Sequence, residues 1–248
     1  MNRAVVITGA SAGIGRALAV EFARRGYRLG LTARRMGVLE ELRQQLQATS
    51  GRESLQVELA SLDVTLDETV APALRDLFAR LGGADIVIAN AGVNDLTRVG
   101  QGDLAKEARM IRTNVIGAMA TVDAAVEHFL ARGAGQVVGI SSLASLQPIK
   151  DQAAYCASKA GFSMYLKSAR RDLVGKGILI TDILPGYVKT DIVEGVDIGE
   201  LPFAISTEQA AREIVSLIER RVERGIVPWF PWALLRPIFG YIPQRWLN

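Results

Sequence analysis

A regular alternation of two residue patterns constrains the fold of this chain more than any other feature. Short apolar runs, rich in β-branched residues and bounded by Gly, Asn or Pro, predict strands buried on both faces. They cover residues 4–8, 29–33, 55–59, 86–89, 137–141 and 179–184. Segments with helical periodicity lie between or after them, at 16–25, 38–47, 68–80, 104–131 with an interruption, 155–174 and 208–223. We therefore expect an α/β fold.

Strands that alternate with helices form mostly parallel sheets, because right-handed crossovers place the helices on both faces. We expect a single-domain, doubly wound sheet of the Rossmann type, with ligands bound beyond the carboxyl ends of the strands. No break in composition divides the 248 residues into two domains. The expected organisation is a nucleotide-binding and catalytic domain over 1–225, followed by an apolar aromatic tail over 226–248.

Composition excludes several classes of function. The formal net charge is only +3 and acids are interleaved with the arginines, so the chain lacks the basic face that nucleic-acid binding requires. Cys156 is the single cysteine and His128 the single histidine, which excludes an intramolecular disulfide and a His/Cys metal cage. The apolar run at the N-terminus passes directly into a glycine-rich turn after Ile7. We interpret it as a first strand and not as a signal peptide.

The last residues differ from the rest of the chain. Residues 225–248 hold all three tryptophans and four of the eight prolines. These prolines and Arg236 argue against a membrane-spanning helix. Large apolar side chains flanked by arginines suit a segment that lies at a membrane surface or covers a subunit interface. The alternative is a segment that packs over the chain's own core.

The sequence TGASAGIG, residues 8–15, follows the first predicted strand and opens the first helix, as a nucleotide-binding glycine turn requires. Gly9 permits an unusual turn, Gly13 allows the backbone to approach a pyrophosphate, and Gly15 permits close packing. The N-terminus of the helix supplies unpaired N–H groups. Taken alone, the motif favours an ordinary glycine-rich strand-to-helix turn.

Tyr155 and Lys159 stand four residues apart in a segment of small residues, AYCASKAG. On a helix this spacing places both side chains on one face, with Cβ atoms about 5 to 6 Å apart. A phenol titrates near pH 10, and an adjacent ammonium would lower its pKa toward the range useful for acid/base catalysis. The alternative is a half-buried aromatic beside a surface lysine.

Both motifs, in this order and context, resemble those of the short-chain dehydrogenase/reductase family. The family's TGxxxGxG spacing matches residues 8–15, and its YxxxK matches residues 155–159. The resemblance extends over Asn90-Ala91-Gly92, Asn114, Ser141-Ser142 and Pro185-Gly186, and so over nearly the whole chain to Thr190.

The resemblance implies a role for each matching residue. Tyr155 would be the general acid/base, Lys159 would lower its pKa and bind the nicotinamide ribose, and Ser142 would polarise the substrate carbonyl. Asn114 would hold a water in a proton relay. Ser142 is preferred over Ser141 because the family's serine stands thirteen residues before its tyrosine; Ser141 would then be a strand-end hydroxyl. The implied cofactor-binding residues are Gly9, Ser11, Gly13, Ile14, Gly15, Arg34, Asp63, Val64, Asn90, Ala91, Gly92, Tyr155, Lys159, Pro185, Gly186, Val188 and Thr190.

Cofactor choice is predicted from the turn after the second strand, TARR at residues 32–35. An acidic residue there would bind the adenosine ribose of NAD, whereas an arginine can bind the 2′-phosphate of NADP. The turn has no acid, so we expect NADP(H) to be favoured over NAD(H). Arg34 is the expected contact, with Ser11 assisting, and Arg35 is expected to be a solvated residue at the start of a helix.

The resemblance implies an enzyme that transfers a hydride between nicotinamide and a carbonyl or secondary alcohol. An apolar segment at 191–205 resembles the family's lid and suggests a hydrophobic substrate, with Tyr187 lining the same cleft; the alternative is a loop packed on its own domain or on a subunit. We expect a cytoplasmic homodimer or homotetramer, with a peripheral membrane contact through the tail. The alternative functions are a catalytically silent nucleotide-binding regulator and a membrane-surface protein of the same fold.

Overall fold

The structure is a computed structural model that describes residues 3–49, 55–190, 192, 201 and 203–235. Its strands are β1 Ala4–Thr8, β2 Arg28–Ala33, β3 Val57–Ser61, β4 Ile86–Ala89, β5 Gly135–Ile140, β6 Ile178–Pro185 and β7 Arg224–Val227. Its helices are α1 Gly13–Arg24, α2 Met36–Thr49, α3 Asp67–Arg80, α4 Leu104–Ile111, α5 Ala118–Arg132, α6 Ala153–Asp172, α7 Thr207–Glu219 and the short α8 Trp232–Leu235. A π-helical turn, Arg112–Gly117, joins α4 to α5, and a 3₁₀ turn, Leu143–Ser145, follows β5.

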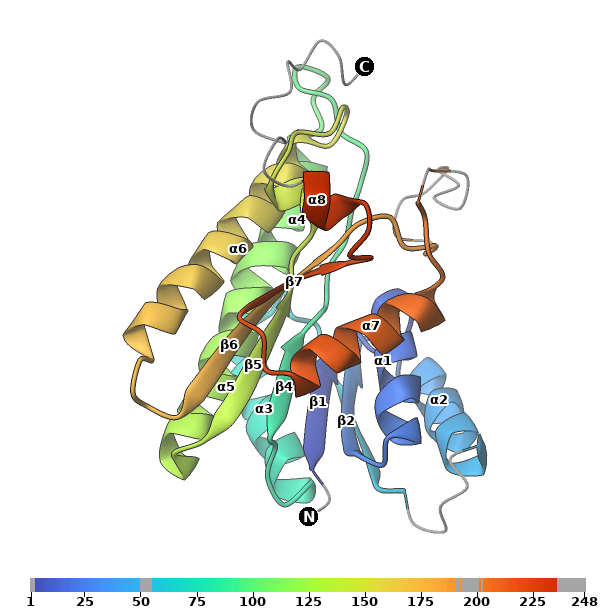
Figure 1. The fold of residues 1–248 in the computed structure, drawn as a ribbon, viewed down its shortest axis with the longest axis vertical. Helices are drawn as coiled ribbons and strands as arrows, with labels where there is room; N and C mark the ends of the chain where they lie inside the picture. Colours follow the sequence, from blue (N-terminus) through green and yellow to red (C-terminus); the bar gives the residue numbers. More distant parts are fainter. Residues whose placement is uncertain (1–2, 50–54, 191, 193–200, 202, 236–248) are drawn as a thin grey trace.

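The strands form one parallel sheet in the order β3-β2-β1-β4-β5-β6-β7 (Figure 1). The order reverses direction between β1 and β4, which is where an open α/β sheet leaves a crevice for a ligand. The predicted single-domain, doubly wound fold is confirmed.

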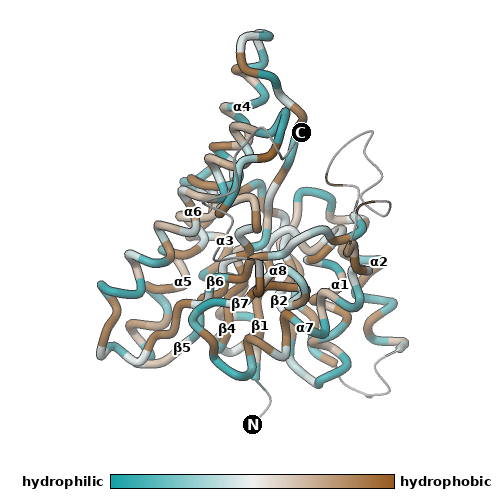
Figure 2. Tube along the Cα trace, turned by 45° about the horizontal axis from the view of Figure 1, so that its top comes forward, coloured by the Kyte–Doolittle hydropathy of each residue, from teal (hydrophilic) through white to brown (hydrophobic). Residues whose placement is uncertain are grey.

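Helices cover both faces of the sheet, because nearly every strand residue is buried and the strands need apolar cover on each side. One hydrophobic cluster joins α1, α2 and α7 to one face, and a second joins α3, α5 and α6 to the other. Figure 2 shows apolar strands in the middle of the molecule and helices whose hydropathy alternates along the chain. The apolar stripes of the helices therefore face the sheet.

The strand bounds show which strands the local sequence pattern predicts correctly. β1 and β4 begin and end where the sequence predicts them. β3 begins two residues later than the predicted 55–59, because its pairing with β2 starts at Leu29 and Val57. Pairing with a neighbouring strand, and not hydropathy alone, sets this register.

The seventh strand corrects the prediction for the C-terminal region. β7 occupies Arg224–Val227, directly after the predicted helix over 208–223 and across the predicted start of the tail at residue 226. The helix ends earlier, at Glu219 in α7, and β7 pairs with Asp182–Pro185 of β6. A four-residue strand containing Gly225 is too short to show a period in the sequence. The expected tail boundary at 225/226 thus falls inside the sheet.

Candidate active site

The carboxyl ends of the strands open into a large pocket. Its volume is about 1690 Å³, above the roughly 300 to 1,000 Å³ of a site for one drug-sized molecule. The residues that follow β1 to β6 all contribute to its wall. The space can hold a dinucleotide together with a second small molecule.

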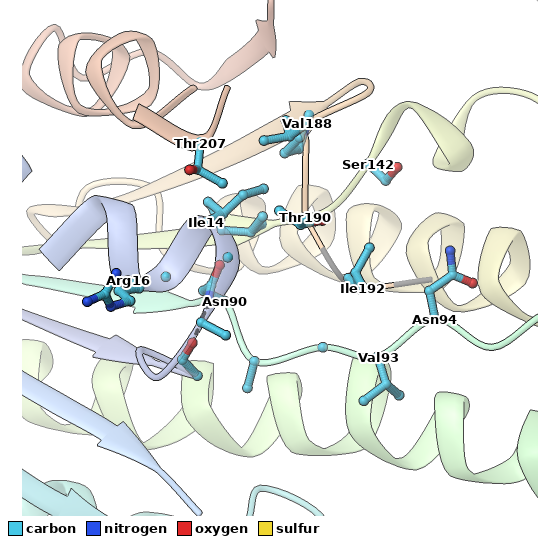
Figure 3. Close-up of a pocket in the computed structure, with 18 of the residues that line it drawn as sticks. Ile14, Arg16, Asn90, Val93, Asn94, Ser142, Val188, Thr190, Ile192 and Thr207 are labelled. Carbon is cyan, nitrogen blue, oxygen red and sulfur yellow. Dashed lines mark hydrogen bonds between the residues drawn. The ribbon is translucent and has the colours of Figure 1, made fainter. Parts of the chain in front are cut away.

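The predicted site residues converge on this pocket with one exception. It is lined by all of the predicted cofactor residues and by Ser142, Tyr155 and Lys159. Asn114 does not line it; this residue lies behind the wall and is 1% exposed. Ile14, Asn90, Val188, Thr190 and Ser142 surround the opening in Figure 3.

The glycine turn between β1 and α1 is built from backbone contacts that no larger residue would allow. A Cβ at Gly15 would lie 2.4 Å from the Gly9 carbonyl oxygen, and one at Gly9 would lie 2.8 Å from Ala91 Cα. Gly9 and Gly13 also have positive φ angles of 69° and 52°, which suits glycine. The turn is therefore packed directly against the end of β4.

Asn90 and Thr8 tie the ends of β4 and β1 together. Asn90 Nδ2 donates to the carbonyl oxygens of Thr8 and Gly9, at 2.9 and 3.3 Å. The Thr8 hydroxyl accepts from the backbone N–H groups of Asn90 and Ala91. This network fixes the crevice at the point where the strand order reverses.

Helix α1 begins at this turn with its first N–H groups available. Among the described residues, no side chain caps the helix at Ala12. Gly13, Ile14 and Gly15 line the pocket, so the positive end of the helix faces it. A phosphate group fits here, because uncapped N–H groups and the helix dipole both favour an anion.

The two arginines after β2 occupy different positions. Arg34 Nη1 lies 3.9 Å from Asp63 Oδ2, whereas Arg35 Nη2 donates to the Ser11 hydroxyl at 3.1 Å. Both arginines are exposed and both line the pocket. The structure therefore places Arg35, which the sequence assigns to the solvent, beside the predicted assistant Ser11.

Helix α6 places Tyr155 and Lys159 one turn apart on its pocket face. Lys159 Nζ lies 5.7 Å from the centre of the Tyr155 ring and donates to the Ile140 carbonyl oxygen at 3.0 Å. Lys159 is only 5% exposed. The ammonium is thus fixed between α6 and the end of β5.

The two serines after β5 have separate roles. The Ser141 hydroxyl is buried, and its one hydrogen has two acceptors within reach, Asp182 Oδ1 at 2.6 Å and the Ile183 carbonyl oxygen at 3.0 Å. Ser142 lines the pocket, and its hydroxyl contacts the Tyr155 phenol and accepts from the Ala144 N–H. The pocket therefore receives Ser142, while Ser141 anchors β5 to β6.

Asp182 is a buried carboxylate beneath the site, and the sequence does not reveal its role. It is 3% exposed and also accepts from the Ser163 hydroxyl at 2.6 Å, one turn beyond Lys159. Arg224 of β7 pairs with the same carboxylate at 3.4 Å. The missed strand β7 thus supplies the counter-ion of this carboxylate.

The pKa values in the site correct one expectation. Burial raises the pKa of Tyr155 to about 12, with the Ser142 hydroxyl opposing the rise. Burial lowers the pKa of Lys159 to about 8, with the Asp182 carboxylate opposing the fall. The expected lowering of the phenol pKa by Lys159 is not found, because the ammonium is held at the Ile140 carbonyl and is itself desolvated. The phenol is protonated at neutral pH.

Asn114 holds the loop after β4 in place. Its Nδ2 donates to the Val93 carbonyl oxygen at 2.8 Å and to the Ser158 hydroxyl at 3.1 Å, and its Oδ1 accepts from the Val93 N–H at 2.8 Å. It lies in the π-helical turn, where Gly117 packs against the Val64 backbone. The predicted interruption of the long helix therefore carries a residue that fixes the pocket wall.

The chain that forms this site also matches a known protein family. The model of the family described as short chain dehydrogenase matches residues 3–200. This chain belongs to the short-chain dehydrogenase family. It is therefore an NAD(P)-dependent oxidoreductase, a dehydrogenase or reductase whose fold binds a nicotinamide cofactor.

Relatives within the family match along almost their full length. An uncharacterized oxidoreductase of Myxococcus xanthus is 39% identical over 95% of this chain and 90% of its own. An uncharacterized oxidoreductase of Mycobacterium tuberculosis is 34% identical over 97% of this chain and 94% of its own.

Solved structures of the family have the same fold. A short-chain dehydrogenase of Sphingobium yanoikuyae in complex with NADPH superposes with a TM-score of 0.84, at 29% identity over 96% of this chain and 92% of its own. An alcohol dehydrogenase of Thermococcus sibiricus, complexed with 5-hydroxy-NADP, superposes with a TM-score of 0.82, at 26% identity over 92% of this chain and 96% of its own.

The pocket wall beside Tyr187 contains a residue that the sequence does not assign to the site. Trp232, from the expected tail, is 9% exposed and lines the pocket. Its ring centre lies 5.6 Å from that of Tyr187 and 5.9 Å from that of Phe203, both edge-on. The predicted position of Tyr187 in the cleft agrees with the pocket wall. Only a tertiary contact brings Trp232 there, so no local pattern signals it.

The lid and tail are described in part. Ile192 and Leu201 line the pocket, whereas the expected lid residues Val193, Val196 and Ile198 and the tail residues 236–248 lie outside the described residues. Trp229, Phe230 and Leu234 are exposed. Within the described residues, none of the helices is both long and apolar enough to cross a membrane.

Proposed function

We propose that the protein is an NADP(H)-dependent reductase of hydrophobic carbonyl compounds. The observation that carries this proposal is one pocket shared by an uncapped helix N-terminus, the two arginines that follow β2 and the Ser142–Tyr155–Lys159 group. When bound, NADPH supplies the hydride, which passes from the nicotinamide C4 to the carbonyl carbon.

The residues of the chain would handle the carbonyl oxygen. Ser142, in contact with the Tyr155 phenol, would donate a hydrogen bond to that oxygen and hold it next to the phenol. Tyr155 would then transfer its proton to the oxygen, leaving an alcohol and a phenolate. A phenol with a pKa of about 12 is protonated at neutral pH and so has the proton that this step requires.

Lys159 would stabilise the phenolate formed in this step, because an ammonium favours a neighbouring anion. Its bond to the Ile140 carbonyl holds the ammonium at the end of β5, where it would also bind the nicotinamide ribose, as the family resemblance implies. Asn114 would hold the relay water, as the family resemblance implies, and its bonds to Val93 and Ser158 orient it from behind the wall.

The experiment that tests this function combines cofactor binding with turnover. The purified protein is titrated with NADPH and NADH, and a panel of alkyl and aryl ketones is screened by the loss of NADPH absorbance. Reduction of ketones with NADPH supports the proposal. NADPH binding without turnover of any carbonyl or alcohol would support a catalytically silent nucleotide-binding regulator.

Two pocket arginines after β2 support the preference for NADP(H): Arg34, near Asp63, and Arg35, which donates to Ser11. A hydrogen bond to a charged group contributes about 1.5 to 3 kcal/mol, so Arg34→Ala or Arg35→Ala should weaken NADPH binding about tenfold or more. NADH binding should hardly change, because NADH lacks the 2′-phosphate. Arg43→Ala, outside the pocket, is the matched control. Equal weakening of both cofactors would contradict the assignment, and the two single variants show which arginine makes the contact.

The oligomeric state and the cellular location of the protein remain predictions. We propose a homodimer or homotetramer, because apolar side chains such as Ile116 and Met164 are exposed on the helices. We also propose that the protein is cytoplasmic. A peripheral membrane contact through Trp229 and Phe230 is the alternative use of the C-terminal segment. Sedimentation and liposome binding of the full chain, compared with a chain that ends at residue 228, would separate the two.

A further inference from the structure

Asp182 of β6 carries a carboxylate in the interior of the sheet, behind the pocket wall. Acidic side chains are rarely buried, and among the residues that the structure describes only Glu21 and Asp182 are. Glu21 pairs with Arg24 and Arg25 of its own helical segment. The partners of Asp182 come instead from three other segments of the chain. A buried charge is costly unless such partners replace its lost water.

The partners of Asp182 suit a negative charge. The Ser141 and Ser163 hydroxyls lie 2.6 Å from its Oδ1 and Oδ2, and Arg224 Nε lies 3.4 Å from Oδ2. Arg224 Nη2 also donates to the Ser163 hydroxyl at 3.3 Å. Hydroxyl groups and a guanidinium all have hydrogens to donate, which is what a carboxylate accepts. Asp182 is therefore a negative charge in a fixed position.

The same contacts surround Lys159. Ser163 follows Lys159 by one turn of α6, and Ser141 directly follows Ile140, whose carbonyl oxygen accepts from Lys159 Nζ at 3.0 Å. Asp182 thus ties together the two segments that hold the ammonium. Burial lowers the pKa of Lys159 to about 8, and the Asp182 carboxylate opposes this fall.

The other charges around Lys159 are in contact with water. The charged side chains of α4, the π-helical turn, α5 and the rest of α6 are all at least partly exposed. Arg109 and Arg112 line the pocket, but each pairs with an acidic side chain. The described β5 and the 3₁₀ turn after it contain no charged residue. Water and salt screen exposed charges, so Asp182 is the carboxylate that acts on Lys159 from the interior.

We propose that Asp182 is a positioning residue for the reaction, whose carboxylate keeps the Lys159 side chain in its ammonium form and directed at the Ile140 carbonyl. A charged Lys159 stabilises the phenolate of Tyr155, whereas a neutral amine does not. This inference rests on the proposed function, in which Lys159 has that role. Asp182 does not line the pocket, so it acts only through Lys159.

The charge of Lys159 can be measured without turnover. The full-length protein, labelled with ¹³C at the ε carbon of lysine, is titrated by NMR, and Lys159→Met identifies the signal of Lys159. The wild-type midpoint should be a pH of about 8. Asp182→Asn keeps the shape of the side chain without its charge and should lower the midpoint by about one pH unit or more. Lys167, exposed on the same helix, is an internal control and should not shift.

Variants of Arg224 separate the charge of Asp182 from a structural role. Arg224→Gln breaks the same ion pair and keeps the carboxylate, so the Lys159 midpoint should stay at or above the wild-type value. A fall of the midpoint in both Arg224→Gln and Asp182→Asn would overturn the proposal, because only their loss of structure is shared. If Asp182→Asn does not fold, Asp182→Asn/Arg224→Gln leaves no unpaired charge and should still lower the midpoint. Asp123→Asn, which removes an exposed carboxylate on α5, is the matched control and should leave the midpoint unchanged.

The pH profile shows whether this charge serves the reaction. For a shift of about one pH unit, kcat/KM of Asp182→Asn with NADPH and a reducible ketone should be about fivefold below wild type at about pH 8. The two enzymes should agree near pH 6, where Lys159 is charged in both. An unchanged Lys159 midpoint, or an equal loss of kcat/KM at both pH values, overturns the proposal. Absence of wild-type turnover with every carbonyl compound would overturn only the proposed function, because the NMR titration still decides whether Asp182 keeps Lys159 charged.

Discussion

The two ends of the pocket are built differently. At the cofactor end, backbone lies against backbone, and Gly9 and Gly15 stand where a Cβ would lie within 3 Å of neighbouring atoms. At the substrate end, side chains meet from separate segments, among them Asn94, Gln152, Tyr187 and Trp232. A backbone site tolerates little change of residue, whereas a side-chain site can change its ligand by single substitutions. The first end therefore suits a ligand common to the family, and the second suits a ligand particular to this protein.

Tyr155 lies where the two ends of the pocket meet. Removal of its hydroxyl should have the largest effect on turnover while leaving cofactor binding unchanged. Tyr155→Phe deletes the donor hydroxyl and keeps the ring, so kcat should fall by about 10² to 10⁴. NADPH affinity should stay near that of the wild type, because the cofactor end is unchanged. Steady-state kinetics and calorimetric titration measure the two effects. Tyr165→Phe, on the same helix and outside the pocket, is the control, and near-normal turnover of Tyr155→Phe would refute the proposed acid.

The pH dependence of folding tests the buried lysine at the cofactor end. Burial lowers the pKa of Lys159 from its ordinary value of 10.5 to about 8, so the unfolded chain binds more protons between these pH values and stability rises with pH. The pKa of Tyr155 is raised from 10.0 to about 12, so its contribution falls with pH only above pH 10. Between about pH 8 and pH 10, Lys159 should add about 2 kcal/mol to the unfolding free energy.

Denaturant unfolding of Lys159→Met should therefore lack this rise, and the variant should be more stable than the wild type near neutral pH. Lys167→Met, which replaces an exposed lysine on the same helix, should leave the slope unchanged. A rise of the wild-type size in Lys159→Met would show that another group causes the dependence.

A substitution of Trp232 tests the substrate end of the pocket, and we expect a smaller effect on kcat/KM than for Tyr155→Phe. Trp232→Leu removes the aromatic wall beside Tyr187 and should lower kcat/KM for apolar ketones about tenfold, mainly through KM, because the lost contacts serve ground and transition states alike. NADPH affinity should be unchanged. Trp229→Leu is a matched control, since Trp229 is 60% exposed and does not line the pocket. An equal loss in both variants, or a loss of NADPH affinity in Trp232→Leu, would contradict the assignment of Trp232 to the substrate end.

The same contrast explains what the sequence predicts. The glycine turn and the Tyr155–Lys159 pair are visible because each depends on residue types at fixed local spacing. β1 and β4 are visible because a strand buried on both faces is a continuous apolar run. β7, Asp182 and Trp232 are not, because their roles depend on contacts between segments far apart in the chain. The predicted lowering of the Tyr155 pKa was wrong for the same reason. The pKa depends on where the Lys159 ammonium is bound and on how far the phenol is buried from water.

Hydride transfer from the cofactor is the central claim, and isotope labelling tests it most directly. NADPH with deuterium at both C4 positions of the nicotinamide is incubated with the wild-type enzyme and a reducible ketone, and the product is analysed by mass spectrometry and NMR. We expect a single deuterium on the carbinol carbon of the product, and none detectable over the same period with Tyr155→Phe. A product alcohol without deuterium, formed by the wild-type enzyme, would contradict direct hydride transfer and with it the proposed function.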